Sequence, residues 1–332
     1  MQMNLKRISI VADIIKTQHF TKQYERILKN IKFYPEKAID PFAGECDLKN
    51  YSPNTNWTFY DIEPKNEYVL KNDSLLNPID YTDKTIITNP PYLAKNKTSE
   101  FDEIFKKYNV DDLYKASILS LIGCKNGILI IPINFFTDEN SKDIRNIFLS
   151  QYKVTYVNVF ENQVFENTTY NVCSFYFEKG KTSEVVFYNV DSNKSTNIIL
   201  SKDFDYRLGG EFYNSFKDIK PVFSRITENN KNNSTDLFLT ALDKRKEKIN
   251  ISFNKKHYIG KKSDRIFATL SCKFILSEEE QLELANKFNS YLNTEREKYN
   301  NLILTNYRDF GRKRISFEDV YKICTMILYD MK

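Results

Sequence analysis

The sequence is poor in the residues that build metal centres and disulfide frameworks. Its 332 residues include five cysteines and two histidines, and no two cysteines form a C-x-x-C pair. This spacing disfavours both a zinc site and a set of structural disulfides. We therefore expect no metal, and we expect the cysteines to be small apolar residues of the core. The cysteines are Cys46, Cys124, Cys173, Cys272 and Cys324.

Long apolar runs are also missing. The first twenty residues, MQMNLKRISIVADIIKTQHF, hold no apolar block of the length that a signal peptide or a membrane span needs. We expect a soluble, cytoplasmic protein with no membrane association. The chain also lacks a G-x-G-x-x-G run, which disfavours dinucleotide binding.

The composition fits a folded chain of one large domain or two ordinary ones. Hydrophobic residues make up 41% and aromatic residues 14% of the sequence, enough to bury a core. Residues 1–180 hold 22 Lys+Arg and 23 Asp+Glu, whereas residues 181–332 hold 27 and 21. The basic excess of the second half suits a polyanionic partner, although many solvated surfaces have the same composition.

Between residues 35 and 180, short apolar runs alternate with segments of helical spacing. This alternation predicts a doubly wound, mainly parallel α/β sheet. Only a short segment separates the last two runs, so one strand there can be antiparallel. Near residue 181 the pattern changes to mixed strands, turns and two strong helical segments, and we place a domain boundary there. The six runs are KAIDPF, WTFYDI, KTIITN, GILIIPI, KVTYVNVF and NVCSFYFEK.

Polar residues stand at the ends of these runs. Asp40, Asp61 and Asn89 end three of them, and Asp73 precedes the third. Each residue alone is more simply a loop residue or a helix cap. Together they should share the edge formed by the carboxyl ends of the strands, where open α/β sheets bind ligands. Asp61 suits ribose hydroxyls, with Glu63 as the second candidate.

The segment IITNPPYLAK, residues 86–95, combines an apolar strand end with two prolines and an aromatic residue. Pro90 and Pro91 end the strand because neither has an N–H to donate. The simpler interpretation is a stiff turn. The alternative is a rigid platform, in which the Asn89 amide oxygen and the Pro90 carbonyl accept the N–H bonds of a flat amine and Tyr92 offers it a ring.

In this order, DPFAGECDL, YDIEP, NDSLL and TNPPY resemble the motifs of S-adenosylmethionine-dependent DNA amino-methyltransferases, and NPPY resembles their adenine-N6 members. The upstream TQHFTKQYERIL resembles the cofactor motif of the gamma group of these restriction–modification enzymes, and NQVFENTTYNVCSFYFEKGK is similar to a late motif of the family. The resemblance covers about residues 15–180. It implies a doubly wound, seven-stranded, mostly parallel methyltransferase sheet in a catalytic domain of residues 1–180. A C-terminal α+β target-recognition domain would follow over residues 181–332.

The resemblance further implies that S-adenosylmethionine is the cofactor and that the target base is flipped out of the duplex. Cys46 departs from the pattern, because the family usually has a second glycine there. The implied residues are Phe20 and Thr21 for the methionine end of the cofactor; Asp40, Phe42, Ala43 and Gly44 for its cradle; Asp61 for its ribose; Asp73 for its adenine amine; Asn89, Pro90, Pro91 and Tyr92 for catalysis, with Asn89 also beside the cofactor; and Tyr92 and Phe165 for stacking on the base, with Tyr170 as the alternative to Phe165.

Two basic clusters in the second half suit contacts with phosphates, and Arg can also read guanine edges. For any one lysine, a solvated surface is the simpler interpretation. The candidates for DNA binding are Lys261, Lys262, Arg265, Arg308, Arg312 and Arg314.

The resulting hypothesis is a DNA adenine-N6 methyltransferase that acts on a specific double-stranded sequence. Its functional partner would be a cognate restriction endonuclease, and its assembly a monomer or a dimer. Two alternatives act on RNA or on a protein glutamine, since both present a planar amine or amide to the same platform. A further alternative is a catalytically silent DNA-binding module, which Cys46 in the cofactor turn keeps open.

Overall fold

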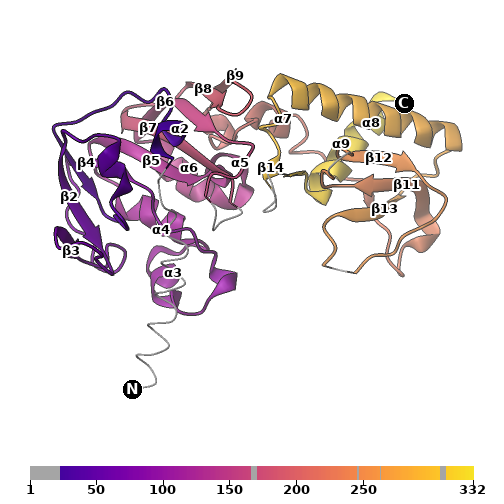
Figure 1. Ribbon diagram of the computed structural model, residues 1–332. Helices are drawn as coiled ribbons and strands as arrows, with labels where there is room; N and C mark the ends of the chain where they lie inside the picture. Colours follow the sequence, from indigo (N-terminus) through magenta and orange to yellow (C-terminus); the bar gives the residue numbers. More distant parts are fainter. Residues whose placement is uncertain (1–22, 166–169, 245–246, 262, 307–311) are drawn as a thin grey trace. The chain divides into compact units, whose positions relative to one another are not determined.

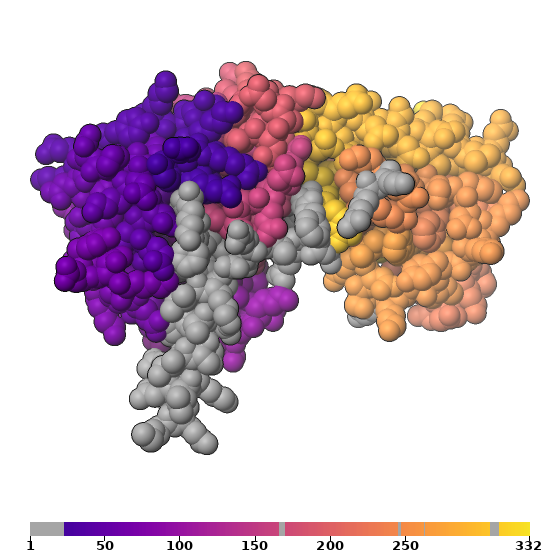
Figure 2. All heavy atoms as spheres, in the orientation of Figure 1, coloured from indigo at the N-terminus to yellow at the C-terminus, as the bar shows by residue number. Residues whose placement is uncertain are grey.

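The computed structural model describes residues 23–165, 170–244, 247–261, 263–306 and 312–332. The chain divides into two compact units, Met1–Arg207 and Leu208–Lys332. In Figures 1 and 2 the first unit runs from indigo to rose and the second from salmon to yellow. No described helix has the length and apolarity that a membrane crossing needs.

The described part of the first unit is built on one nine-stranded sheet, in the order β3-β2-β1-β4-β5-β7-β6-β8-β9. Neighbouring strands from β3 to β5 are parallel, whereas β7 is antiparallel to both β5 and β6, as the short connection before it allows. The strands are β1 (Lys37–Asp40), β2 (Asn56–Asp61), β3 (Val69–Lys71), β4 (Thr85–Thr88), β5 (Asn126–Pro132), β6 (Tyr152–Val159), β7 (Val172–Lys179), β8 (Glu184–Asn189) and β9 (Lys194–Ile199).

The sheet has nine strands rather than the expected seven, because β8 pairs in parallel with β6 and β9 pairs with β8. These two strands extend the first compact unit beyond residue 180, to Arg207. The β8–β9 hairpin has the short strands and polar turn of a new domain, and only its long-range pairing with β6 shows that it belongs to the first sheet.

Most helices of the first unit lie in the connections between the strands, whereas α2 precedes β1 and η4 follows β9. They are α2 (Tyr24–Ile27), α3 (Asp102–Tyr108), α4 (Leu113–Ser120), α5 (Asn134–Thr137) and α6 (Lys142–Leu149), with 3-10 helices η1 (Asp47–Asn50), η2 (Lys95–Lys97), η3 (Glu139–Ser141) and η4 (Lys202–Phe204). The helical spacing between β4 and β5 is interrupted between α3 and α4. Asn109 ends α3 in the left-handed conformation, with φ +52°, and the Asp112 side chain caps the start of α4.

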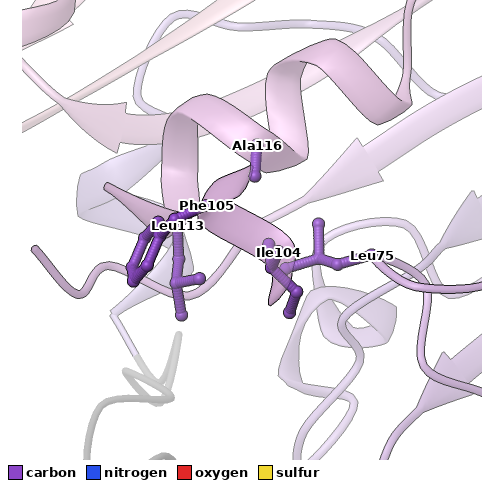
Figure 3. Close-up of a cluster of buried hydrophobic side chains, with 5 residues drawn as sticks. All are labelled: Leu75, Ile104, Phe105, Leu113 and Ala116. Carbon is purple, nitrogen blue, oxygen red and sulfur yellow. The ribbon is translucent and has the colours of Figure 1, made fainter. Parts of the chain in front are cut away.

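A hydrophobic cluster joins α3 and α4 to the turn that follows β3. Figure 3 shows Leu75 beside Ile104 and Leu113 beside Phe105, with Ala116 on the next turn of α4. Phe42 and Leu93 also pack against this cluster, from the segments that follow β1 and β4. The cluster therefore supports, from one side, the loops at the carboxyl ends of three strands.

The second unit packs helices against an antiparallel sheet of order β10-β13-β11-β12, and a short pair, β14 and β15, lies outside this sheet. Helix α8 lies along β12 and β11 (Figure 1). It begins with a capping box at Ser277 and Glu280. The elements are α7 (Gly210–Asn214), β10 (Phe223–Arg225), η5 (Lys231–Asn233), β11 (Ser234–Thr240), β12 (Asn250–Phe253), β13 (Phe267–Cys272), α8 (Glu278–Lys298), β14 (Thr305–Asn306), β15 (Lys313–Arg314) and α9 (Phe317–Asp330).

Close pairing of β4 with β5 requires a glycine at position 127, and this yields a first prediction. A Cβ at Gly127 would lie 1.8 Å from the carbonyl oxygen of Ile86, a backbone atom that cannot swing aside. Gly127→Ala should therefore lower the free energy of unfolding of the first unit by about 3 kcal/mol. Urea unfolding followed by the fluorescence of Trp57, the one tryptophan, measures this unit. The exposed Lys125→Ala is the control, and equal midpoints for both variants would contradict the prediction.

Candidate active site

Polar residues from four neighbouring strands meet at the carboxyl edge of the sheet. Asp40 and Asp61 are the last residues of β1 and β2, Asp73 follows β3 by two residues, and Asn89 directly follows β4. These four strands are adjacent and parallel, in the order β3-β2-β1-β4. The structure thus brings the four residues to one edge.

The Asp61 carboxylate fixes the turn that follows β1. Its Oδ2 accepts a hydrogen bond from the Gly44 N–H (2.9 Å), and its Oδ1 accepts one from the Glu63 N–H (2.9 Å). Asp61 is only 2% exposed, whereas Glu63 is half-buried. Gly44 has φ +51°, a left-handed conformation that glycine adopts without steric cost. The turn therefore passes close to the carboxylate at the end of β2.

Cys46 also has a left-handed backbone, with φ +62°, a conformation that only glycine adopts without steric cost. Its side chain is buried in a cluster with Ala43, Phe59 and Val69. Burial raises the pKa of the thiol to about 11, so it stays neutral beside the carboxylates. The Cys46 side chain is thus part of the core under the turn.

Asp40 is a buried carboxylate held by two neutral donors. Its Oδ1 accepts hydrogen bonds from Thr88 Oγ1 (2.7 Å) and from the Phe42 N–H (3.1 Å). Burial raises the pKa of Asp40 to about 7; the hydrogen bonds from Thr88 and Phe42 lower it, and the charge of Asp61 raises it. Sequence analysis missed Thr88, whose only signal is its place as the last strand residue before Asn89.

Asp73 orders the turn after β3. Its Oδ1 accepts hydrogen bonds from the N–H groups of Leu75 (3.0 Å) and Leu76 (2.9 Å). Leu75 belongs to the hydrophobic cluster of Figure 3. The carboxyl group of Asp73 is thus anchored to the same cluster that supports the loop after β1.

The segment Asn89–Tyr92 is buried throughout. Pro90 and Pro91 are buried, Asn89 is 9% exposed and Tyr92 is 1% exposed. The Tyr92 hydroxyl lies within hydrogen-bond distance of the Asn89 side-chain oxygen and 2.6 Å from the carbonyl oxygen of Ile130 on β5. Burial raises the pKa of Tyr92 well above its usual value, so the hydroxyl remains a neutral donor.

Tyr170, one of the two aromatic candidates in the late motif, lies beside Tyr92. The two rings have centroids 6.0 Å apart and are tilted by 60°. Tyr170 is half-buried, and its hydroxyl donates to Asp112 Oδ2 (3.2 Å). Phe165 is 4% exposed, and its carbonyl oxygen accepts a hydrogen bond from Gln163 Nε2 (2.7 Å).

The described candidates for DNA binding belong to the second unit. Lys261 and Arg265 are exposed on the loop between β12 and β13. This loop is braced by Asp264, whose Oδ2 accepts from the Tyr258 hydroxyl (2.6 Å) and the Lys261 N–H (2.8 Å). Arg312 and Arg314, at and beside β15, are half-buried, while Phe20, Thr21, Lys262 and Arg308 lie outside the described residues.

A buried ion pair organises the basic region of the second unit. Arg296 Nη1 and Nη2 donate to Asp243 Oδ1 (2.8 Å) and Oδ2 (2.6 Å). Asp243 Oδ1 also accepts from the Ile249 N–H (2.9 Å), and the Asp243 N–H donates to the Lys313 carbonyl (2.9 Å). Asp243 therefore links Arg296 of α8 to Ile249 and to Lys313 of β15.

Comparison with known protein families gives a match to the model described as N-6 DNA Methylase, over residues 35–252. This span is more than half of the chain. It includes all four polar strand ends at the carboxyl edge of the sheet. Comparison with curated proteins gives no match.

Comparison with solved structures gives low sequence identities. The type I restriction–modification methyltransferase subunit from Streptococcus thermophilus is 16% identical, with a TM-score of 0.36, over 61% of this chain and 51% of that one. The type I restriction enzyme EcoKI M protein is 12% identical (TM-score 0.40; 51% and 47%). The type IIG restriction endonuclease BpuSI is 14% identical (TM-score 0.36; 98% and 48%). The chain spans about half the length of these proteins.

The buried Asp40 yields a pH-dependent prediction. Its pKa of about 7 in the folded protein exceeds the ordinary value of 3.8, so between these values the folded state binds more protons than the unfolded state. Stability should therefore fall as pH rises through this window. Asp40→Asn keeps an acceptor for Thr88 and carries no charge. We expect its advantage in free energy of unfolding over the wild type to grow by about 2 kcal/mol between pH 5 and pH 8.

The measurement is urea unfolding at both pH values, followed by Trp57 fluorescence. Asp143→Asn, on an exposed face of α6, is the matched control and should show no such change. A constant difference between wild type and Asp40→Asn at the two pH values would show that Asp40 does not titrate in this window.

Proposed function

The chain belongs to the N-6 DNA Methylase family, and we propose that it transfers a methyl group from S-adenosylmethionine to the N6 amine of adenine in a specific double-stranded DNA sequence. The observation that carries the proposal is the buried Asn89–Tyr92 segment, which directly follows β4 at the same edge of the sheet as the carboxylates of Asp40, Asp61 and Asp73. We also propose that this methylation protects host DNA from a cognate restriction endonuclease. Such protection requires the methyltransferase to modify the specific sequence that the endonuclease cuts.

The chemistry of the carboxyl edge fits a cationic methyl donor. The ionised form of Asp40 is disfavoured by burial and by Asp61, and the hydrogen bonds that it accepts come from neutral groups. A cation bound at this edge would favour the charged form. S-adenosylmethionine supplies a methyl group already activated on a sulfonium.

We assign the cofactor to residues around three strand ends. Asp40 and the backbone of the turn after β1 would hold it near the sheet, Asp61 would accept from its ribose, and Asp73 would accept from its adenine amine. Phe20, Thr21, Phe42, Ala43, Gly44 and Asn89 complete the proposed cofactor site.

Asn89 and Pro90 would activate the target amine. The lone pair of an exocyclic adenine amine is delocalised into the ring, which makes it a poor nucleophile. If the Asn89 side-chain oxygen and the Pro90 carbonyl both accept its N–H groups, charge that develops on the nitrogen is stabilised by dipoles fixed in advance. An amide oxygen has two lone pairs, so Asn89 can accept from Tyr92 and from the substrate together. Pro91 limits the freedom of the same backbone.

Base stacking requires a change around Tyr92 or Phe165, since both side chains are almost fully buried. A base flipped from the duplex loses a few kcal/mol of stacking and pairing, and stacking on an aromatic side chain returns about 1–3 kcal/mol. Tyr170 is half-buried and lies beside Tyr92, so it offers a ring with part of its surface already exposed. We propose Tyr92 with Phe165 or Tyr170 as the stacking pair.

Contacts with the DNA backbone are proposed for the second unit. Lys261 and Arg265 are exposed on a loop that Asp264 braces, so their side chains extend from a defined backbone. Arg312 and Arg314 are half-buried at the short strand pair, which suits contacts at defined positions more than a diffuse basic surface. Lys262 and Arg308 belong to the same proposed set.

The reaction is tested by transfer of labelled methyl groups to genomic DNA that lacks prior methylation, followed by nucleoside analysis. The wild type should yield N6-methyladenine. Asn89→Ala removes one acceptor of the amine and should lower the rate about 100-fold with little change in DNA affinity. Asn197→Ala, on the exposed face of β9, is the control. Label in RNA or protein alone would contradict the DNA assignment, and full activity of Asn89→Ala would contradict the role of Asn89.

Charge removal in the second unit tests the DNA contacts. The double variant Lys261→Ala/Arg265→Ala should weaken DNA binding and lower the slope of log K against log salt by about 2, since each phosphate contact contributes about 0.9. Binding isotherms at several salt concentrations measure the slope. Lys194→Ala, on the exposed edge of β9, should leave it unchanged. An unaltered slope in the double variant would place the phosphate contacts elsewhere.

A further inference from the structure

Asp112 connects three separate segments through one buried carboxylate. Asp112 is 6% exposed and stands directly before α4. Its Oδ1 accepts from the N–H groups of Leu93 (3.1 Å) and Tyr114 (3.4 Å). Its Oδ2 accepts from the Tyr170 hydroxyl (3.2 Å). The Tyr114 bond is a helix cap, whereas the other two bonds lead away from the helix.

Both of these other bonds end beside Tyr92. Leu93 is the next residue in the chain, and its carbonyl oxygen accepts a second bond from the Leu113 N–H (3.1 Å). The Tyr170 ring is the one whose centroid lies 6.0 Å from that of Tyr92. The carboxylate therefore fixes both the backbone that follows Tyr92 and an aromatic ring that lies beside it. The rigid support is the start of α4, where Leu113 enters the cluster of Figure 3.

We propose that Asp112 is a positioning residue for the target base: it holds the Tyr170 hydroxyl against the end of the Asn89–Tyr92 segment, and so places the Tyr170 ring as the stacking partner of the base. This inference rests on the proposed methyl transfer to adenine. It assigns the stacking role to Tyr170 over Phe165, and it gives a function to a residue whose only sequence signal is that of a helix cap.

The charge state of Asp112 supports this role. Burial raises the pKa of Asp112 to about 6, while hydrogen bonds from Tyr114 and Tyr170 and the charge of Lys115 lower it. At pH 8 the group is therefore ionised and is a strong acceptor for a hydroxyl. Lys115 lies on the same helix and pairs with Asp111 (2.7 Å), so its charge is shared with a second carboxylate.

The two oxygens of Asp112 allow the cap to be separated from the link to Tyr170. Tyr170→Phe removes only the hydroxyl that Oδ2 accepts, and it keeps the ring. Asp112→Asn keeps an oxygen for the N–H groups of Leu93 and Tyr114, but its NH₂ group cannot accept from Tyr170. Both variants thus lose the same bond and retain the helix cap.

The experiment measures steady-state methyl transfer by the full-length protein to unmethylated genomic DNA at pH 8. We expect each variant to lower kcat/KM for DNA about 10-fold, as for one hydrogen bond to a charged group, with KM for S-adenosylmethionine unchanged and no fall in the unfolding midpoint. The double variant should be no worse than either single one, because both remove one interaction. Tyr176→Phe, which also loses a hydroxyl bond to a carboxylate (Glu178, 3.1 Å), is the matched control and should keep full activity.

The outcomes are distinguishable. A wild type that puts no label into adenine would overturn the proposed function, and this inference with it. An active wild type with fully active Tyr170→Phe and Asp112→Asn would overturn the inference alone. Losses that multiply in the double variant, or that follow a lowered unfolding midpoint, would also overturn it, because they would show two independent or merely structural effects.

Discussion

Two buried carboxylates hold the two ends of the segment on which the proposed chemistry depends. Asp40 accepts a hydrogen bond from Thr88, the residue before Asn89, and Asp112 accepts one from Leu93, the residue after Tyr92. Between these points two prolines restrict the backbone. The direction of the Asn89 side chain and of the Pro90 carbonyl therefore depends on β1 at one end and on the start of α4 at the other. Dipoles that stabilise developing charge must be fixed before the reaction, and this double anchorage is how the fold fixes them.

The fold was predictable where its signals are local. Apolar runs identified the long strands, and their alternation with helical spacing gave the parallel sheet. β3 is only three residues long and leaves no periodic pattern to detect. The sequence pattern of the β8–β9 hairpin is the same whether the hairpin extends the first sheet or begins a new domain. Only the pairing of β8 with β6, between residues far apart in the sequence, distinguishes the two cases. The break between α3 and α4 did have local signals, Asn109 and Asp112. The helical spacing of apolar residues nevertheless continues across these positions, so the pattern does not show the break.

The position of the candidate site was predictable from the sequence, but the hydrogen bonds and packing of its residues were not. Parallel strands end at the same edge, so topology alone places Asp40, Asp61 and Asn89 together. Which groups they bond is a matter of packing that no motif specifies. The sequence suggested the Tyr92 ring for stacking on the base, and the structure buries this ring with its hydroxyl beside the Asn89 side chain. Cys46, which departs from the family pattern, has a left-handed backbone and a side chain buried in the core.

Raised pKa values point to the same segment without any motif. Within the described residues, the carboxylates with a raised pKa are Asp40 and Asp112, and burial is the main cause for both. Burial of a carboxylate lowers the free energy of unfolding near neutral pH, so each of these two groups makes the fold less stable. These two groups lie at opposite ends of one four-residue segment. Groups with perturbed pKa values tend to gather where a protein acts on its ligand, and here both groups bond to residues that flank the segment that would hold the adenine amine. Removing either carboxylate would remove a buried charge that lowers stability, but it would also leave the Asn89–Tyr92 segment less firmly held. At this place in the chain, stability and the proposed function therefore make opposite demands.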